Sequence, residues 1–118
     1  MTKPFVRFMK HERIGMQSIR NAVTRAEKGL IDADLGGGLI KQRVARRGQG
    51  RSGGYRFLIA YKINQRMVFL TGFAKNEREN IDDDQEKTLK QIGGLWLAAS
   101  SELIVRAIEA GELREVTL

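Results

Sequence analysis

The chain has 118 residues, a formal net charge of +7, one histidine, one proline and no cysteine. This length favours a single domain over residues 1–118, because a second hydrophobic core of useful size would not fit. The absence of cysteine excludes a disulfide scaffold and a cysteine nucleophile, and the single histidine excludes a multi-histidine zinc site. No stretch approaches the roughly 18 apolar residues of a membrane span, and the first residues lack the apolar core of a signal peptide, so we expect a cytoplasmic protein.

The first third of the chain predicts a strand, a helix and a loop in succession. Residues 5–9 are short and rich in β-prone side chains, which favours a first strand. From residue 11 or 12 to residue 28, apolar residues recur every three or four positions, which predicts an amphipathic helix that ends at Gly29. Residues 31–38 contain three consecutive glycines and two aspartates, a composition typical of a loop.

The middle of the chain predicts three strands, over residues 39–46, 55–63 and 67–74. Glycine-rich residues 48–54 are expected to form a turn or loop between the first two strands, and residues 64–65 a hairpin tip between the last two. The second and third of these strands are apolar on both faces over much of their length. This pattern predicts central strands that are covered on both sides, or on one side by a partner protein.

The last third predicts two helices, one opening near residues 80–84 and one capped by Ser100 or Ser101 and ending at Gly111. Residues 113–118 are expected to form a last short strand or a tail. Taken together, the elements predict a small α+β domain with an antiparallel sheet and the order β-α-β-β-β-α-α. The apolar residues expected to face the core are Leu89, Ile92, Trp96 and Ala99 in the first of these two C-terminal helices, and Leu103, Ala107 and Ile108 in the second.

The positive charge is concentrated in the middle of the chain. No acidic residue lies between Asp34 and Glu77, and residues 35–76 contain nine basic ones. The rest of the chain has 12 basic and 14 acidic residues, so the whole excess of positive charge comes from this segment. A segment of one sign predicts a polyanionic partner, nucleic acid first. A basic surface that serves only solubility is the alternative.

Three motifs that suggest other sites have simpler explanations. Residues 48–53 match the dinucleotide-binding spacing Gly-x-Gly-x-x-Gly, but that motif must open a helix, and here it leads into a strand. It is instead expected to be a connection that carries Arg51 close to a phosphate, or a plain turn. The aspartates at 82–84 are explained by the dipole of a helix start rather than by a metal. Tyr55 could stack on a base, although core packing is favoured.

Four basic residues are predicted to converge on one part of the sheet. Lys41 and Arg43 share a strand face, Arg56 lies near the start of the next strand, and antiparallel pairing brings Lys75 towards Arg56. Such a cluster predicts a bound phosphate. RNA supplies its own nucleophile, the 2′-hydroxyl, and a lysine crowded by cations has a lowered pKa and can transfer protons. The cluster could therefore cleave RNA without a metal or a cofactor.

Residues 41–56 and 72–77 together resemble the RelE/ParE superfamily of type II toxin–antitoxin toxins, and most of all its HigB-like branch. The resemblance rests on a basic strand, a glycine-rich connection, the motif Gly-Tyr-Arg and then the motif Lys-Asn-Glu. It extends from about residue 35 to residue 81. It implies a metal-independent mRNA endonuclease that acts by 2′-hydroxyl attack, commonly on mRNA in the ribosomal A site. It also implies a cognate antitoxin, typically of the helix-turn-helix type in the HigB-like branch. No association with a membrane is expected, because no stretch is apolar enough to span one.

The resemblance also implies roles for individual residues. Lys41 and Arg43 match strand residues that transfer protons and contact phosphate, Arg56 matches the arginine that stabilises the transition state, and Lys75 matches a residue that can protonate the leaving oxygen. The tyrosine that follows on the next helix of RelE is absent, because residues 79–81 are Glu-Asn-Ile. Further contacts to RNA phosphates are implied for four arginines, Arg46, Arg47, Arg51 and Arg78.

Two other functions stay open at this point. A toxin of the gyrase-inhibiting ParE type would share the fold without being a nuclease. A non-catalytic nucleic-acid-binding domain, including a degenerate toxin, would bind RNA in a salt-dependent manner and leave it intact.

Overall fold

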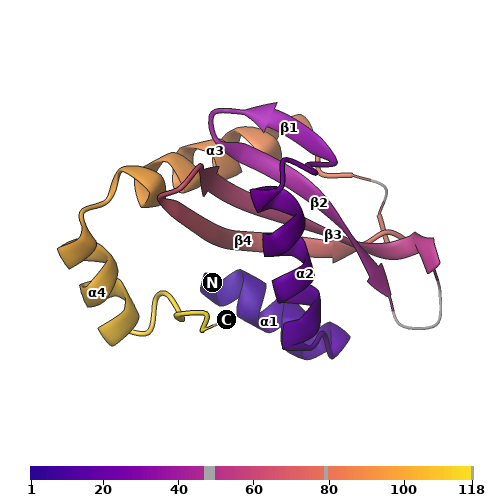
Figure 1. Cartoon of the computed structure of the whole chain (residues 1–118), viewed down its shortest axis with the longest axis horizontal. Coiled ribbons are helices and arrows are strands. Elements are labelled where there is room, and N and C mark those ends of the chain that lie inside the picture. The colour runs from indigo at the N-terminus through magenta and orange to yellow at the C-terminus, as the bar shows by residue number, and fades with distance from the viewer. Residues whose placement is uncertain (47–49, 79, 118) are drawn as a thin grey trace.

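The computed structural model of the chain describes residues 1–46, 50–78 and 80–117, with the backbone alone for residues 50–53. Its strands form one antiparallel sheet in the order β1-β2-β3-β4, and helices precede and follow that sheet (Figure 1). The predicted α+β class with an antiparallel sheet is therefore confirmed. The elements are α1 (Lys3–Glu12), α2 (Met16–Glu27), β1 (Ala33–Gly36), β2 (Leu39–Arg46), β3 (Gly50–Lys62), β4 (Arg66–Ala74), α3 (Asp83–Ala98) and α4 (Ser101–Glu109).

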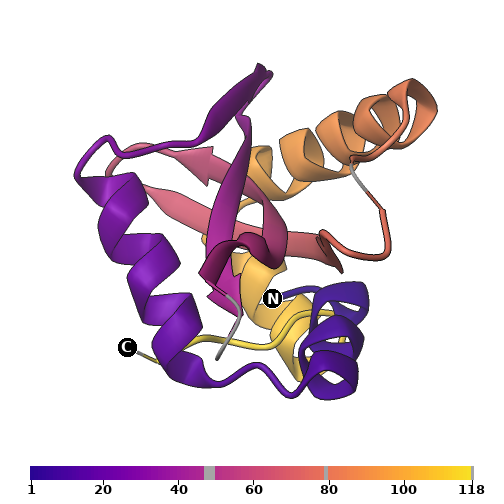
Figure 2. The same ribbon diagram turned by 90° about the vertical axis from the view of Figure 1, so that its right-hand side faces the viewer.

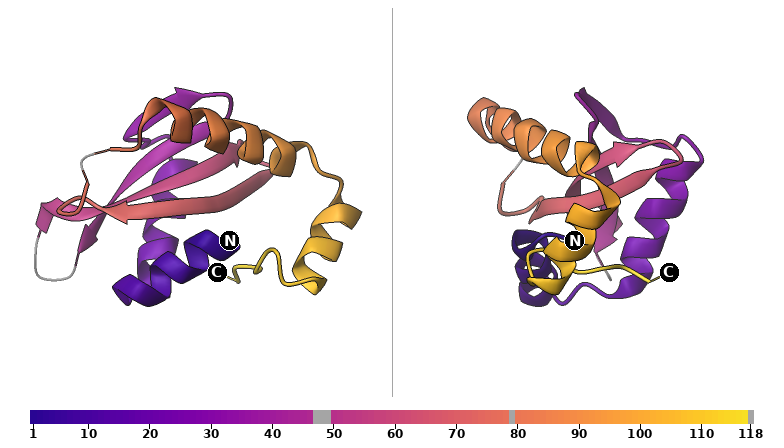
Figure 3. Two further views of the ribbon diagram at one scale, coloured as in Figure 1. Left: turned by 180° about the vertical axis from the view of Figure 1, so that it is seen from behind. Right: turned by 90° about the vertical axis from the view of Figure 1, so that its left-hand side faces the viewer.

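Helices cover both faces of the sheet. Figure 2 shows α2 and α3 on opposite sides of it, and the rear view in Figure 3 shows α3 lying across the second face. On the first face, α1 and α2 bury a cluster around Phe5, Ile19 and Phe57. On the second face, α3 and α4 cover a cluster that includes Leu58 and Leu70. This double coverage is the reason why β3 and β4 are apolar on both faces.

The first predicted strand is wrong, because residues 5–9 belong to α1. Thr2 caps this helix, its Oγ1 accepting a hydrogen bond from the backbone N–H of Phe5 at 3.3 Å. Pro4 lies in the first turn, where its missing N–H costs no helical hydrogen bond. Phe5, Phe8 and Met9 recur at helical spacing and pack into the cluster on the first face. Burial of that stripe outweighs the β propensity of the individual residues.

The predicted helix from residue 11 or 12 to residue 28 is interrupted. Arg13 follows α1 with a left-handed φ of 56°, and α2 begins only at Met16. The predicted loop over residues 31–38 is wrong in part, because it contains β1, which pairs with the start of β2. Gly37 and Gly38, with φ of 61° and 84°, form the reversal between these two strands.

Of the two turns predicted within the sheet, the one between β3 and β4 is confirmed and the one between β2 and β3 is wrong in part. The tip at residues 64–65 is confirmed, with Asn64 at a left-handed φ of 61°. The predicted turn over residues 48–54 is wrong for residues 50–54, whose backbone extends β3. Residues 48 and 49 lie outside the described residues.

The two C-terminal helices are confirmed, although two residues predicted to face the core are exposed. Asp82 and Ser100 are their caps, and Asp82 forms a capping box with Gln85, so a helix start does account for Asp82. Ile92 and Leu103, predicted to face the core, are 40% and 48% exposed. After α4, Leu113 alone forms an isolated bridge with Thr2, so the described residues 113–117 are closer to the predicted tail than to a strand.

Candidate functional site

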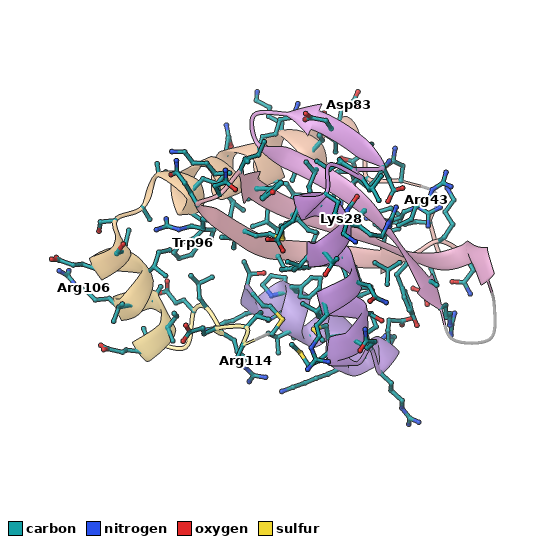
Figure 4. All side chains as sticks on the ribbon, viewed as in Figure 1. Lys28, Arg43, Asp83, Trp96, Arg106 and Arg114 are labelled. Carbon is teal, nitrogen blue, oxygen red and sulfur yellow. The ribbon has the colours of Figure 1, made fainter. Side chains whose placement is uncertain are left out.

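The register of the sheet brings the four predicted basic residues together. Arg43 of β2 lies directly opposite Arg56 of β3, and Lys41, two residues earlier on β2, shares their face. Lys75 follows β4, and its backbone N–H donates to the carbonyl of Gly54 at 2.9 Å. All four lie on the sheet face that α3 covers in part. Figure 4 shows Arg43 towards one end of the sheet and Trp96, which lies near the C-terminal end of α3, towards the other.

Backbone contacts of Arg43 explain why the two arginines are close. Its N–H donates to Oδ2 of Asp32, and its carbonyl accepts from Nη1 of Arg25 at 3.0 Å. Both groups therefore point away from β3, so Arg43 and Arg56 form a non-hydrogen-bonded pair, the kind in which opposed side chains are closest. Arg25 and Asp32 also pair with each other at 3.1 Å. These two residues hold the edge of β2 and keep two like charges side by side.

The electrostatics of the cluster are those of cations crowded together. Arg56 is only 7% exposed, and burial followed by the charge of Arg43 lowers its pKa, while Asp32 acts in the opposite direction. The pKa of Lys41 is lowered first by burial and then by the nearby charges of Arg56, Lys75 and Arg43. A lysine with a lowered pKa is more readily present as the neutral amine, which is the form that accepts a proton.

Three residues of this site are not indicated by the sequence. Asp32 and Glu86 both lie outside the segment without acidic residues, yet Asp32 raises the pKa of Arg56 and Glu86 raises that of Lys41. Asn80 accepts a hydrogen bond from Nζ of Lys41 through its Oδ1 at 3.2 Å. A signal that could have been used exists for Glu86 alone, which lies in the first turn of a helix that follows the last strand closely.

Tyr55 lies on the other face of the sheet, so it is not placed to stack on a base in the cluster. It is 5% exposed, its ring meets that of Phe8 edge-on, and its hydroxyl donates to the carbonyl of Glu12 at 3.4 Å. Core packing, the favoured alternative, is therefore confirmed for Tyr55.

Of the four arginines for which contacts to RNA phosphates are implied, the structure describes the side chains of two. The guanidinium of Arg46, which is partly exposed, lies 5.7 Å from the ring centroid of Tyr55. Arg78 is exposed and donates to Oε1 of Gln85 at 3.2 Å. Arg47 and the side chain of Arg51 lie outside the part of the chain that the structure describes.

A separate apolar groove of about 640 Å³ lies between the start of α1, the edge of β4 and α3. Leu70, Phe73 and Trp96 line it, and Arg78 and Ile81 lie on the same lining. None of the four clustered cations contributes to it, so this groove is a distinct surface.

Within the part of the chain that the structure describes, no group of three or more histidine, cysteine, aspartate or glutamate side chains comes together as ligands for a metal ion. Over the same residues, every helix is too short or too polar to span a bilayer.

Comparison with known proteins places the chain in a family. The model of the RelE toxin of the RelE/RelB toxin–antitoxin system matches residues 1–116. A search of curated proteins gave no match. The family match extends over the helices on both sides of the sheet, well beyond residues 35–81, where the motifs lie. The chain therefore belongs to the RelE toxin family: it is the toxin of a toxin–antitoxin system, and its partner is an antitoxin.

Proposed function

We propose that this toxin is a metal-independent endoribonuclease that cleaves mRNA on the ribosome. The observation that carries the proposal is the gathering of Lys41, Arg43, Arg56 and Lys75 on one face of the sheet. Like charges held this close destabilise a protein unless an anion is bound among them. The phosphate of RNA is an anion that four such side chains suit in charge and in hydrogen-bonding capacity.

The reaction we propose uses the 2′-hydroxyl of the substrate as nucleophile. Its oxygen forms a bond to the adjacent phosphorus while the bond from phosphorus to the 5′-oxygen breaks, which leaves a 2′,3′-cyclic phosphate and a 5′-hydroxyl end. One proton leaves the 2′-hydroxyl and another is given to the 5′-oxygen. Lys41 and Lys75 are our candidates for these transfers, and Arg43 and Arg56 for stabilising the charge of the phosphorane.

Dependence on the ribosome is proposed because the cluster alone offers little to align the RNA. In-line attack needs the 2′-oxygen, phosphorus and 5′-oxygen nearly collinear, and such alignment is worth many orders of magnitude in rate. Tyr55 is buried on the opposite face and does not supply this alignment. In the proposal, the ribosome orders the mRNA, and Arg47, Arg51 and Arg78 contact phosphates around the cluster. Arg46, whose guanidinium lies over Tyr55 on the opposite face, would contact RNA only away from the cluster.

The antitoxin is proposed to be a helix-turn-helix protein, in line with the HigB-like resemblance of the basic strand and the Gly-Tyr-Arg motif. The apolar groove beside β4 supports a protein partner in general, because contiguous apolar surface of this kind often marks a site of protein association. The neighbouring open reading frame tests this part of the proposal directly.

The nuclease is tested by expressing the wild type, Arg56→Ala and Lys75→Ala in bacteria and mapping mRNA 5′ ends. The wild type is expected to stop growth and to produce new 5′-hydroxyl ends within reading frames. Arg56→Ala is expected to lower cleavage by at least about 100-fold, the usual effect of removing one preorganised charge-stabilising group. Lys62→Ala, a change at an exposed lysine at the far end of β3, is the matched control and is expected to cleave normally.

Three results would contradict the proposal. DNA damage with intact mRNA would identify a gyrase-inhibiting toxin of the ParE type. Salt-dependent RNA binding without cleavage, even on ribosomes, would identify a non-catalytic toxin. Equal cleavage by the wild type, Arg56→Ala and Lys75→Ala would remove the cationic cluster from the mechanism.

A further inference from the structure

The connection between β4 and α3 contacts Lys41 of the cationic cluster through Asn80. Oδ1 of Asn80 accepts hydrogen bonds from Nζ of Lys41 at 3.2 Å and from the backbone N–H of Ile81 at 2.9 Å. The first of these joins residues that are 39 positions apart in the chain. It is therefore a tertiary contact between the connection and β2.

Hydrogen bonds anchor Arg78 and Asp82, which lie on either side of Asn80 in the chain, to the first turn of α3. Oε1 of Gln85 accepts from Nη1 of Arg78 at 3.2 Å and from the backbone N–H of Asp82 at 3.1 Å. Asp82 in turn caps α3 by accepting from the N–H of Gln85 at 2.8 Å. Asn80 therefore lies in a short connection of which Arg78 and Asp82 are both bonded to the start of the helix, and its own carboxamide is bonded to Lys41 and to the N–H of Ile81.

We propose that Asn80 is a positioning residue for Lys41: its neutral carboxamide oxygen holds the lysine amine beside Arg56 and Lys75 through both protonation states. This inference rests on the proposed function, since it gives Asn80 a part in a proton transfer by Lys41. The inference holds whether Lys41 removes the proton of the 2′-hydroxyl or protonates the 5′-oxygen, because its amine changes protonation state in either transfer.

The neutrality of Asn80 is what suits it to this part. An amide oxygen accepts an N–H from an ammonium group or from an amine, so the contact survives loss of the proton. A carboxylate in the same place would favour the ammonium form. The charged groups that face Lys41 are Arg43 on β2, Arg56 on β3, Lys75 after β4 and Glu86 on α3, and Glu86 alone raises its pKa. Glu86 also pairs with Lys90 at 3.2 Å, which engages part of its charge elsewhere.

The experiment compares Asn80→Asp, Asn80→Ala and Glu86→Gln in the full chain, with Asn76→Ala as the matched control. Asn76 is exposed in the same connection, and its side chain makes no hydrogen bond to any described residue. Two quantities are measured for each protein: the pKa of the Lys41 amine, by NMR of isotope-labelled lysine side chains, and the pH dependence of single-turnover mRNA cleavage on ribosomes. Thermal unfolding verifies that each variant is folded.

Each variant has a distinct expected result. Asn80→Asp raises the pKa of Lys41 and moves the corresponding limb of the pH–rate profile upward by the same amount, whereas Glu86→Gln moves both downward. Asn80→Ala slows the cleavage step roughly tenfold or more with little change in KM, because the amine loses its fixed position. Asn76→Ala changes none of these quantities.

The two measurements separate failure of this inference from failure of the proposed function. Asn80→Ala that cleaves at the wild-type rate, or Asn80→Asp that leaves the pKa of Lys41 unchanged, would overturn the role of Asn80. If the wild type itself does not cleave, the proposed function fails and the catalytic part of Asn80 fails with it. The pKa of Lys41 in Asn80→Asp then still decides whether Asn80 controls that amine.

Discussion

At the scale of single residues, Arg43 and Arg56 show a conflict between the stability of the fold and the activity proposed for them. They are directly opposed on β2 and β3, and Arg56 is buried. Like charges directly opposite on two strands are destabilising, by up to about 1 kcal/mol per pair. The charge of Asp32 opposes this effect at Arg56. The pair thus lowers the stability of the fold, as the proposed binding of phosphate by these two residues would lead us to expect.

Arg43→Gln is expected to stabilise the folded protein while weakening RNA cleavage. Glutamine keeps the backbone contacts of Arg43 and removes one of two opposed charges, so the free energy of unfolding should rise by about 0.5 kcal/mol at low salt. High salt should reduce this gain, because it screens the repulsion in the wild type. Urea unfolding at two ionic strengths measures both effects. Arg20→Gln, at an exposed position of α2, is the control, and a loss of stability in Arg43→Gln would refute the argument.

Strand alternation predicts the cationic residues of the site but not their neighbours. The period of two places Lys41 and Arg43 on one face, and antiparallel pairing adds Arg56. Asn80 and Asp32 come from connections outside the strands, and no local pattern reports which strand residue a connection will contact. The lack of acidic residues in residues 35–76 therefore indicates a basic segment, but it does not reveal the residues from outside that segment that contact the cluster.

At the scale of secondary-structure elements, α3 depends on β4 for its C-terminal end. Its last turn contains no basic residue, and its C-cap, Ala99, has extended backbone. Nη1 of Arg66, at the start of β4, donates to the carbonyls of Trp96 at 2.6 Å and Ala99 at 2.7 Å. A guanidinium from the sheet thus satisfies carbonyls that the helix leaves without intrahelical partners, and it complements the helix dipole.

Arg66→Ala is expected to lower the free energy of unfolding by about 2 kcal/mol, since it removes charged hydrogen bonds to partly buried carbonyls. Urea unfolding measures this loss. The control is Arg106→Ala, whose side chain is 73% exposed and pairs with Glu102 at 3.8 Å. Such an exposed pair contributes about 0.5 kcal/mol or less. Equal losses in the two variants would show that Arg66 does not anchor α3.

The elements that the sequence predicts best are those with a single compatible pattern. The apolar runs of β2, β3 and β4 are bounded by turn residues and fit no helix, so their central parts are predicted correctly. Residues 5–9 fit both a short strand and one face of a helix. Three features favour the helix: Thr2 as its cap, Pro4 in its first turn and the burial of Phe5. Only the first two of these can be seen in the sequence.

At the scale of the whole molecule, the two ends of the described chain are joined. The amine of Met1 donates to the carbonyl of Arg114 at 2.8 Å, and the N–H of Arg114 donates to the carbonyl of Met1 at 2.8 Å. Thr2 and Leu113 form a bridge beside them. Figure 1 shows the two termini close together below the sheet. The segment after α4 is thereby attached to the start of α1.

This junction predicts a pH dependence of stability. Burial, and then the charge of Arg114, lowers the pKa of the Met1 amine from 8.0 to about 6. Between these values the unfolded chain binds more protons at this group than the folded one does, so stability from this source rises from about pH 6 to about pH 8 and is level above that. Urea unfolding across this range measures the rise. The Nα-acetylated chain, which cannot titrate there, should lack this contribution, and an identical pH dependence in both proteins would contradict the assignment.

The alternation of β3 makes the length of that strand as important as its composition. Tyr55 and Arg56 are neighbours in the chain, yet the first packs against α1 and the second joins the cations on the opposite face. Inserting or deleting one residue ahead of them would exchange the two faces. A guanidinium would then enter the aromatic core, and a phenol ring would enter the proposed phosphate site. Substitutions in β3 can therefore adjust the activity one side chain at a time, whereas a change of one residue in strand length would disrupt the core and the site together.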